Sequence, residues 1–137
     1  AGGQGKRLRP FTDNCPKPML LVDGKPMLQI LLEQYIACGF KRFYLSVNYL
    51  KEQIIDFFRD GSRFGVEINY LVEDSPLGTA GSLKLMPKTE DEPFVVVNGD
   101  VLTQISPIQL LKLSQIFHPI RYYGERCSLN IQFTKMR

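Results

Sequence analysis

Histidine and cysteine, the side chains that most often build metal centres, are scarce in this sequence. Its 137 residues include one histidine, His118, and three cysteines, Cys15, Cys38 and Cys127. The cysteines are an odd number at unrelated spacings, without the paired C-x-x-C pattern of a zinc site. We therefore expect neither a zinc centre nor a disulfide framework.

Long apolar runs are absent as well. No stretch of about 18 apolar residues occurs, and the N-terminus lacks the apolar segment of a signal peptide. With 44% hydrophobic and 23% charged residues, the composition is that of a soluble globular domain. We expect a single cytoplasmic domain without membrane contact.

Excess positive charge is missing from most of the chain. The formal net charge is +3, and the opening segment accounts for all of it, since Lys6, Arg7, Arg9 and Lys17 are accompanied there by only one acidic residue, Asp13. A nucleic-acid-binding protein more often spreads basic residues over a whole face, with aromatic residues between them. The concentration of charge favours a compact anionic ligand over nucleic acid.

What the chain does contain is a glycine-rich opening, "AGGQGKRLRP", that turns basic within a few residues. A Walker A loop is excluded because Gly5-Lys6 is followed by Arg7 rather than by serine or threonine. The dinucleotide fingerprint G-x-G-x-x-G fails at its third glycine, where Leu8 stands, and Pro10 would break the helix that should follow. What remains is a turn of small residues whose backbone N–H groups can converge on phosphate oxygens.

Apolar periodicity predicts alternating helices and strands along the rest of the chain. Leu28, Leu31, Leu32 and Tyr35 have helical spacing, with Gly39 at a C-terminal cap. The predicted elements are helices over 26–37, 50–58, 79–86 and 106–117, and strands over 42–47, 66–72 and 94–97. This order predicts an α/β fold with a mostly parallel sheet covered on both faces, in which ligands bind at the carboxyl ends of the strands.

Three further features would lie at that edge of the sheet. Lys17 stands between Pro16 and Pro18, which restrict the backbone around it and argue for a placed ammonium, the alternative being a solvated lysine. The segment "EDSPLGTAG", residues 73–81, forms either an ordinary turn or a close approach for a base or a phosphate. Asp100 follows the most apolar strand, where it either caps a turn or binds Mg²⁺ together with substrate phosphates.

Three separated stretches of the chain carry a family resemblance. "AGGQGKRLRPFTDNCPKPML", "EDSPLGTAGSL" and "VVVNGD" together resemble the sugar-1-phosphate nucleotidyltransferase family, whose members include mannose-1-phosphate guanylyltransferases and glucose-1-phosphate thymidylyltransferases. The resemblance implies a three-layer α/β/α Rossmann-like sheet of the glycosyltransferase-A type, mostly parallel and truncated. It makes residues 1–115 the nucleotide-binding part and leaves 116–137 as a divergent C-terminal tail.

By that resemblance, the protein transfers a nucleotidyl group from a nucleoside triphosphate (NTP) to a sugar 1-phosphate, giving a nucleotide sugar and pyrophosphate. Arg7 would neutralise phosphate charge, Lys17 would contact the reacting phosphates, and Asp100 would bind Mg²⁺. The nucleotide would lie against Ala1, Gly2, Gly3, Gly5, Lys6, Glu73, Gly78 and Thr79, with Gly78 next to the base. No general base is required, because the phosphate of a sugar 1-phosphate is already an anionic nucleophile.

Glu73 bears on the choice of nucleotide, because the family places a residue at this position near the nucleobase edge. A carboxylate only accepts hydrogen bonds, so it can take N1–H and N2–H of guanine side by side, whereas a uracil or thymine edge offers a single donor. GTP with a hexose 1-phosphate is therefore favoured. The alternative is that Glu73 points to solvent.

Two features depart from the family pattern. Family members usually have an apolar strand immediately before the glycine loop, whereas this sequence starts at Ala1. After about Gln115 the chain no longer resembles the portion that binds the sugar, and a changed reading frame is one hypothesis for this tail. Two interpretations stay open: a working transferase, and a non-catalytic nucleotide-binding or regulatory fragment of one. Homo-oligomerisation also stays open.

Overall fold

The computed structural model describes residues 5–75, 77, 81–87, 94–100, 102, 107–109 and 132–133. The predictions made for Ala1, Gly2, Gly3, Gly78 and Thr79 lie outside these residues, and of Lys6 only the backbone is described. Most of the predicted helix over 106–117 and most of the tail over 116–137 also lie outside them, although residues 107–109 are helical.

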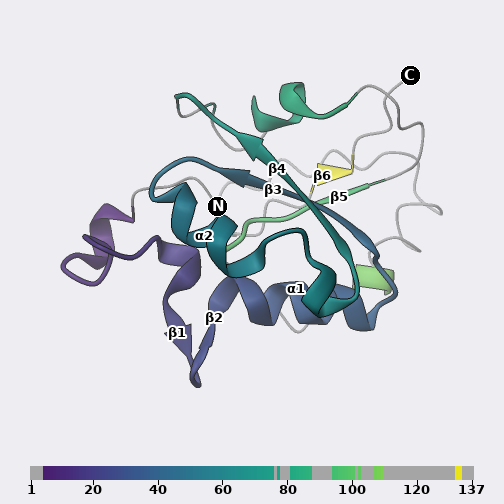
Figure 1. Ribbon diagram of the computed structural model, residues 1–137, viewed down its shortest axis with the longest axis horizontal. Coiled ribbons are helices and arrows are strands. Elements are labelled where there is room, and N and C mark those ends of the chain that lie inside the picture. Colours follow the sequence, from purple (N-terminus) through teal and green to yellow (C-terminus); the bar gives the residue numbers. More distant parts are fainter. Residues whose placement is uncertain are drawn as a thin grey trace.

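Short 3₁₀ helices, α-helices and strands follow one another along the chain (Figure 1). The helical elements are η1 (Lys6–Leu8), η2 (Lys17–Met19), α1 (Met27–Ala37), α2 (Lys51–Phe58), η3 (Ser62–Phe64) and η4 (Gly81–Leu85). The strands are β1 (Leu21–Val22), β2 (Lys25–Pro26), β3 (Arg42–Val47), β4 (Glu67–Val72), β5 (Val95–Val96) and β6 (Gln132–Phe133). In the part of the chain that is described, no helix has the length and apolar character needed to cross a membrane.

Helix α1 confirms the prediction drawn from apolar spacing. Its buried residues are Leu28, Leu31, Leu32 and Tyr35, the stripe that a helix turns toward a core. Gly39 follows the helix with φ 93°, in the region that favours glycine after a helix end. Helix α2 and strands β3 and β4 also lie within one residue of their predicted bounds.

Three local predictions need correction. The described part of the helix predicted over 79–86 is the 3₁₀ helix η4, because the few residues before Pro87 do not suffice for a stable α-helix. Strand β5 has two residues rather than four. The β1–β2 hairpin was not predicted, although its turn, Asp23-Gly24, has the Asp-Gly signal and the positive φ angles, 50° and 79°, of a two-residue hairpin.

Strands β3 and β4 form the parallel pair expected of an α/β fold. Their register runs from Arg42 opposite Glu67 to Val47 opposite Val72. Within the described residues this is the one parallel pair, and β1–β2 and β5–β6 are antiparallel pairs of two residues each. The α/β class is confirmed, while the described residues contain less parallel sheet than predicted, because the partner of β5 among them is the antiparallel strand β6.

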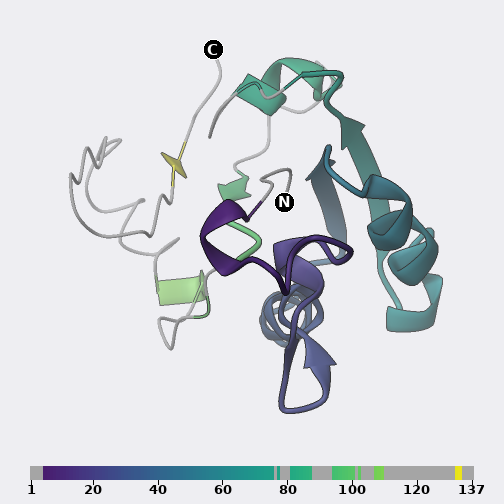
Figure 2. The ribbon, with the colours of Figure 1, turned by 90° about the vertical axis from the view of Figure 1, so that its left-hand side faces the viewer.

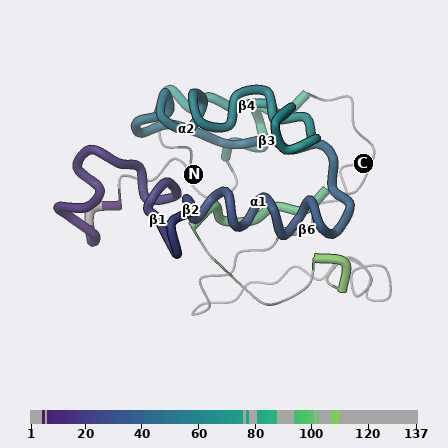
Figure 3. Tube along the Cα trace, turned by 60° about the horizontal axis from the view of Figure 1, so that its bottom comes forward, coloured from purple at the N-terminus to yellow at the C-terminus, as the bar shows by residue number. Residues whose placement is uncertain are grey.

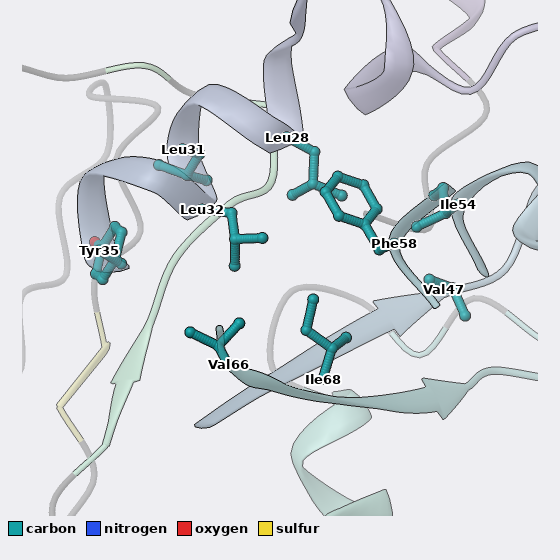
Figure 4. Close-up of a cluster of buried hydrophobic side chains, with 9 residues drawn as sticks. All are labelled: Leu28, Leu31, Leu32, Tyr35, Val47, Ile54, Phe58, Val66 and Ile68. Carbon is teal, nitrogen blue, oxygen red and sulfur yellow. The ribbon is translucent and has the colours of Figure 1, made fainter. Parts of the chain in front are cut away.

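The hydrophobic core lies between the two α-helices and one face of the β3–β4 pair (Figure 4). Helix α2 contributes Ile54 and Phe58, strand β3 contributes Val47, and all three are fully buried. Val66 and Ile68 join them at the start of β4. Burial of a side chain such as Phe58 contributes about 1.5–3 kcal/mol to folding. Packing of both helices on this face therefore fixes where the carboxyl ends of β3 and β4 lie.

The opposite face of β4 is covered near its carboxyl end. Side chains alternate along a strand, so Leu71 and Glu73 point away from the face that carries Ile68. Leu71 is 7% exposed and Glu73 is 9% exposed, and η4 contacts β4. Figure 2 shows η4 next to the tip of the β4 arrow. The segment after β4 thus folds back over the sheet edge where ligands were expected.

Candidate active site

Lys17 and Asp100 meet in the folded chain. Lys17 Nζ lies 2.5 Å from Asp100 Oδ2, and the two side chains are 33% and 32% exposed. Lys17 begins η2 between Pro16 and Pro18, both of which are buried. The prolines restrict the backbone on either side, and the ion pair holds the partly exposed ammonium next to Asp100. Asp100 lies in the turn that follows β5, which brings it to the same place as Lys17.

Gly5 has a left-handed backbone conformation immediately before η1, and we call this point the glycine turn. This residue has φ 59°, and a Cβ atom added to it would lie 2.9 Å from Thr12 Cγ2, so only glycine fits without a shift of the chain. The Thr12 hydroxyl, 1% exposed, donates to the carbonyl oxygen of Gly5 at 2.9 Å. Helix η1 begins at the next residue and places Arg7 on the surface. Thr12 therefore ties the glycine turn to the segment that leads to Lys17.

Side chains from the turn after β3 and from the first residues of α2 hold that same segment. The Tyr49 hydroxyl donates to the carbonyl oxygen of Asp13 at 2.8 Å. Gln53 Nε2 donates to the carbonyl oxygen of Asn14 at 2.9 Å. Figure 3 shows the N-terminal segment, in purple, at the same end of the molecule as this turn. Nothing in the sequence indicated these two contacts, because polar residues after a strand and in the first turn of a helix are ordinary surface features.

Glu73 is buried rather than directed to solvent, which excludes the alternative considered for it. Its Oε1 accepts a hydrogen bond from the Ser46 hydroxyl, and its Oε2 accepts one from the backbone N–H of Leu77 at 2.9 Å. Its carbonyl oxygen accepts a hydrogen bond from Asn48 Nδ2 at 2.6 Å. Each carboxylate oxygen has two lone pairs, and the bonds from described side-chain and backbone groups occupy one on each. The carboxylate is thereby held in one orientation.

The thiol of Cys15 lies just before the buried Pro16. Burial raises the pKa of the Cys15 thiol above its usual value. At neutral pH the side chain is therefore a neutral group and adds no negative charge next to Lys17.

One carboxylate is the metal ligand that the described residues offer here. They contain no group of three or more His, Cys, Asp or Glu side chains that could hold a metal ion by itself. Mg²⁺ does not need such a cage, because it is usually held by one or two carboxylates together with substrate phosphates and waters. Asp100 Oδ2 already holds a cation, the Lys17 ammonium, at 2.5 Å. The site thus fits a magnesium ion that is shared with a phosphate ligand.

The structure describes five of the predicted site residues with their side chains: Gly5, Arg7, Lys17, Glu73 and Asp100. It brings Lys17 and Asp100 into direct contact, and it ties the Gly5 turn to the segment before Lys17 through Thr12. Glu73 contacts neither of these groups through a side-chain hydrogen bond; it is bonded to β3 and to the loop after β4. The roles assigned to all five stay predictions.

The comparison with protein families identifies the family of the chain. The family model described as "Nucleotidyl transferase" matches residues 1–118. The chain belongs to the nucleotidyl transferase family. The resemblance inferred from the three sequence motifs is therefore confirmed, and Lys17 and Asp100 of this family member come from the first and the last of those motifs.

Curated relatives of this nucleotidyl transferase family member carry the names of sugar-phosphate enzymes. An N-acetylmuramate alpha-1-phosphate uridylyltransferase of Neisseria meningitidis is 44% identical over 107 residues, which is 77% of this chain and 46% of the relative. A mannose-1-phosphate guanyltransferase of Yarrowia lipolytica is 43% identical over 105 residues, 74% of this chain and 29% of the relative. The chain spans less than half the length of these relatives. Their names include both uridylyl and guanylyl transfer.

A solved structure supports the fold of the family member. HddC from Yersinia pseudotuberculosis, whose structure was determined in complex with GMP-PN, matches with a TM-score of 0.72 and 33% identity over 83% of this chain and 51% of HddC. The α/β nucleotidyltransferase fold is thus shown by both the arrangement of the described elements and this likeness.

Proposed function

We propose that this chain forms the nucleotide-binding part of a sugar-1-phosphate nucleotidyltransferase. The observation that carries the proposal is the 2.5 Å contact between Lys17 and Asp100, which places a cation and a metal-type ligand together beside the segment that starts at the glycine turn. In the whole protein the substrates would be an NTP and a hexose 1-phosphate. A cytoplasmic location and the absence of membrane and nucleic-acid partners stay predictions.

The proposed reaction needs alignment and neutralisation of charge more than proton transfer. A phosphate oxygen of the sugar 1-phosphate forms a bond to the α-phosphorus, the bond between that phosphorus and the bridging oxygen breaks, and pyrophosphate leaves with the electron pair. Lys17 would donate to the phosphate oxygens as a compact charge, and Arg7 would neutralise further phosphate charge. The backbone N–H groups of the glycine turn at Gly5 would hold the triphosphate in place.

Asp100 is the residue that would hold the divalent ion in this proposal. Bound there, Mg²⁺ would supply charge neutralisation at the phosphate oxygens. If that oxygen took a metal, the Lys17 ammonium would move away from Asp100, and both side chains are partly exposed. Lys17 would then donate to a phosphate oxygen.

GTP is the nucleotide that the proposal favours. The support for it is the buried carboxylate of Glu73, which is held in one orientation by Ser46 and Leu77 and has a second lone pair on each oxygen. Two parallel acceptors match the N1–H and N2–H donors of guanine. The relatives named for guanylyl transfer and the HddC complex with GMP-PN agree with this choice, whereas the relative named for uridylyl transfer does not.

The test combines binding and turnover. Purified chain with Mg²⁺ is titrated with GTP, dTTP, UTP, CTP and ATP while its thermal unfolding is followed, and release of pyrophosphate is measured with a panel of hexose 1-phosphates. A ligand at about 100 times its Kd stabilises the folded chain by about 2.7 kcal/mol, and we expect the largest shift with GTP. Stabilisation without pyrophosphate release would identify a nucleotide-binding fragment. A chain that no NTP stabilises would contradict the proposed site.

A further inference from the structure

One short segment contacts both halves of the proposed nucleotide site. This segment, residues 46–53, comprises the end of β3, the turn that follows and the first residues of α2, and we name it the bridging segment. The segment is anchored near both ends, because Val47 in β3 and Ile54 in α2, the residue that follows the segment, are both fully buried in the core. Leu50, with φ 49° and ψ 38°, reverses the chain between them. The backbone of the bridging segment is therefore held in one position, and so are the side chains that start from it.

On one side, the bridging segment holds the segment proposed to lie against the base. The Ser46 hydroxyl donates to Glu73 Oε1, and Asn48 Nδ2 donates to the Glu73 carbonyl oxygen at 2.6 Å. The Glu73 backbone N–H donates in turn to the Val47 carbonyl oxygen at 2.9 Å. Through Oε2, Glu73 also holds the backbone N–H of Leu77. The bridging segment thus fixes both the carboxylate and the loop that follows it.

On the other side, the bridging segment holds the chain between the glycine turn and Lys17. Tyr49 and Gln53 donate to two consecutive carbonyl oxygens, those of Asp13 and Asn14. Lys17 follows shortly after, behind the fully buried Pro16. A shift of residues 13–14 would therefore be passed on to the Lys17 backbone through a short and restricted stretch of chain.

We propose that the bridging segment sets the spacing between the base-binding and phosphate-binding halves of the site, with Ser46, Asn48, Tyr49 and Gln53 as its positioning residues. The inference rests on the proposed function, since it assigns the two halves to one nucleotide. An NTP extends from its base to its γ-phosphate and therefore contacts both halves of the site. If the two halves are already held at the right spacing, the protein does not have to become ordered when the NTP binds, and affinity is higher. None of the four side chains has to touch the nucleotide for this.

The two ends of the bridging segment are tested with different probes. Tyr49→Phe removes only the hydroxyl that holds Asp13, and we expect it to weaken binding of Mg²⁺-GTP and of inorganic tripolyphosphate by about fivefold each, the effect of one lost hydrogen bond. Ser46→Ala removes the hydroxyl that holds Glu73. We expect it to weaken the binding of GMP and of GTP by a similar factor and to lower the preference for GTP over UTP. The affinity for tripolyphosphate should stay unchanged.

Each variant has a matched control elsewhere in the chain. Tyr70 donates its hydroxyl to the carbonyl oxygen of Arg59 at 2.6 Å, and Ser62 donates its hydroxyl to Asp60 at 2.7 Å, both outside the bridging segment. Tyr70→Phe and Ser62→Ala should therefore keep wild-type affinity for every probe. Calorimetric titration of the four variants gives the affinities, and thermal unfolding confirms that each is folded at the temperature used.

Hydrogen exchange supplies a readout that needs no ligand. Amide exchange of residues 10–17 should become faster in Tyr49→Phe and stay at the wild-type rate in Tyr70→Phe. If wild type binds GTP and both Tyr49→Phe and Ser46→Ala bind all probes like their controls, the bridging role is wrong and the proposed function stands. If wild type binds neither NTP nor tripolyphosphate, the proposed function is wrong and the bridging role falls with it.

Discussion

Lys17 Nζ lies 2.5 Å from Asp100 Oδ2, although the two residues are 83 positions apart in the chain. The contact joins the first and the last of the three motifs that identify the family. It means that the cation and the carboxylate proposed for phosphate and metal binding neutralise each other in the free chain. In the proposed function, an NTP would pair with Lys17 and a divalent ion would be held by Asp100, so binding would replace this ion pair by two others.

Lys17→Ala is expected to leave the fold intact and to lower NTP affinity and turnover strongly, by about a hundredfold in turnover if it removes a charge that neutralises the transition state. Its effect on stability should be within about 1 kcal/mol, because the pair with Asp100 is about one-third exposed and screened by solvent. Lys25→Ala, which breaks the surface pair with Glu33 at 2.9 Å, is the control. Pyrophosphate release and urea unfolding are measured for both. Near-normal turnover in folded Lys17→Ala would contradict the assigned role.

Asp100→Asn is expected to remove the metal dependence of nucleotide binding. The amide keeps the size of the side chain but not its charge, so it no longer attracts a divalent ion. Binding of Mn²⁺ in the presence of GTP, followed by its paramagnetic resonance signal, should weaken at least about tenfold. Glu33→Gln, which loses a carboxylate of the Lys25 surface pair, should bind Mn²⁺ like wild type. Equal Mn²⁺ affinity in both variants would exclude Asp100 as the ligand.

Gly5→Ala is expected to destabilise the chain more than Gly65→Ala. Both glycines have positive φ, 59° and 69°, where an L-residue costs about 1–2 kcal/mol. The new Cβ at position 5 would also lie 2.9 Å from Thr12 Cγ2, whereas position 65 has no atom within 4 Å. Urea unfolding should therefore separate the two variants, and NTP affinity should fall only in Gly5→Ala. Equal free energies of unfolding would show that the Thr12 contact relaxes freely.

Glu73→Gln is expected to reduce the preference for GTP over dTTP. The amide nitrogen of glutamine cannot accept hydrogen bonds, so one acceptor for guanine is lost. The internal bonds can be kept, because the amide oxygen accepts from the Leu77 N–H and the amide nitrogen donates to the Ser46 hydroxyl. The Kd for dTTP divided by the Kd for GTP, both measured by calorimetric titration, should fall about tenfold. An unchanged ratio would show that Glu73 positions the loop without reading the base.

Tyr35 is expected to make stability depend on pH in the alkaline range. Burial, and to a lesser extent the charge of the nearby Cys38, raises the pKa of Tyr35 to about 12, so the folded chain holds this proton more tightly than the unfolded chain does. The contribution of the neutral Tyr35 side chain to the free energy of unfolding is complete below a pH of about 10 and is lost as the pH rises through about 12. The loss amounts to at most about 2 kcal/mol. Urea unfolding over this range should show a smaller pH dependence in Tyr35→Phe. If the free energy of unfolding changed with pH in the same way in wild type and in Tyr35→Phe, Tyr35 would not be the source of the alkaline pH dependence.

The sequence by itself determined the local elements. The spacing of Leu28, Leu31, Leu32 and Tyr35 predicted α1, and alternation or apolar runs predicted β3 and β4, because such patterns record which face of an element is buried. The Asp23-Gly24 hairpin was equally readable and was missed. The three motifs also sufficed for the family, which the comparison confirmed over residues 1–118.

Only the tertiary structure decided which residues meet. Lys17 contacts Asp100, and Tyr49 donates a hydrogen bond to the Asp13 carbonyl oxygen. Glu73 is buried and accepts hydrogen bonds from Ser46 and Leu77. Most of these contacts join segments that lie apart in the sequence. Periodicity reports the environment of a residue but not its partner. For Ser46 and Glu73 the partner follows from the register of β3 against β4, which brings the ends of these two strands together.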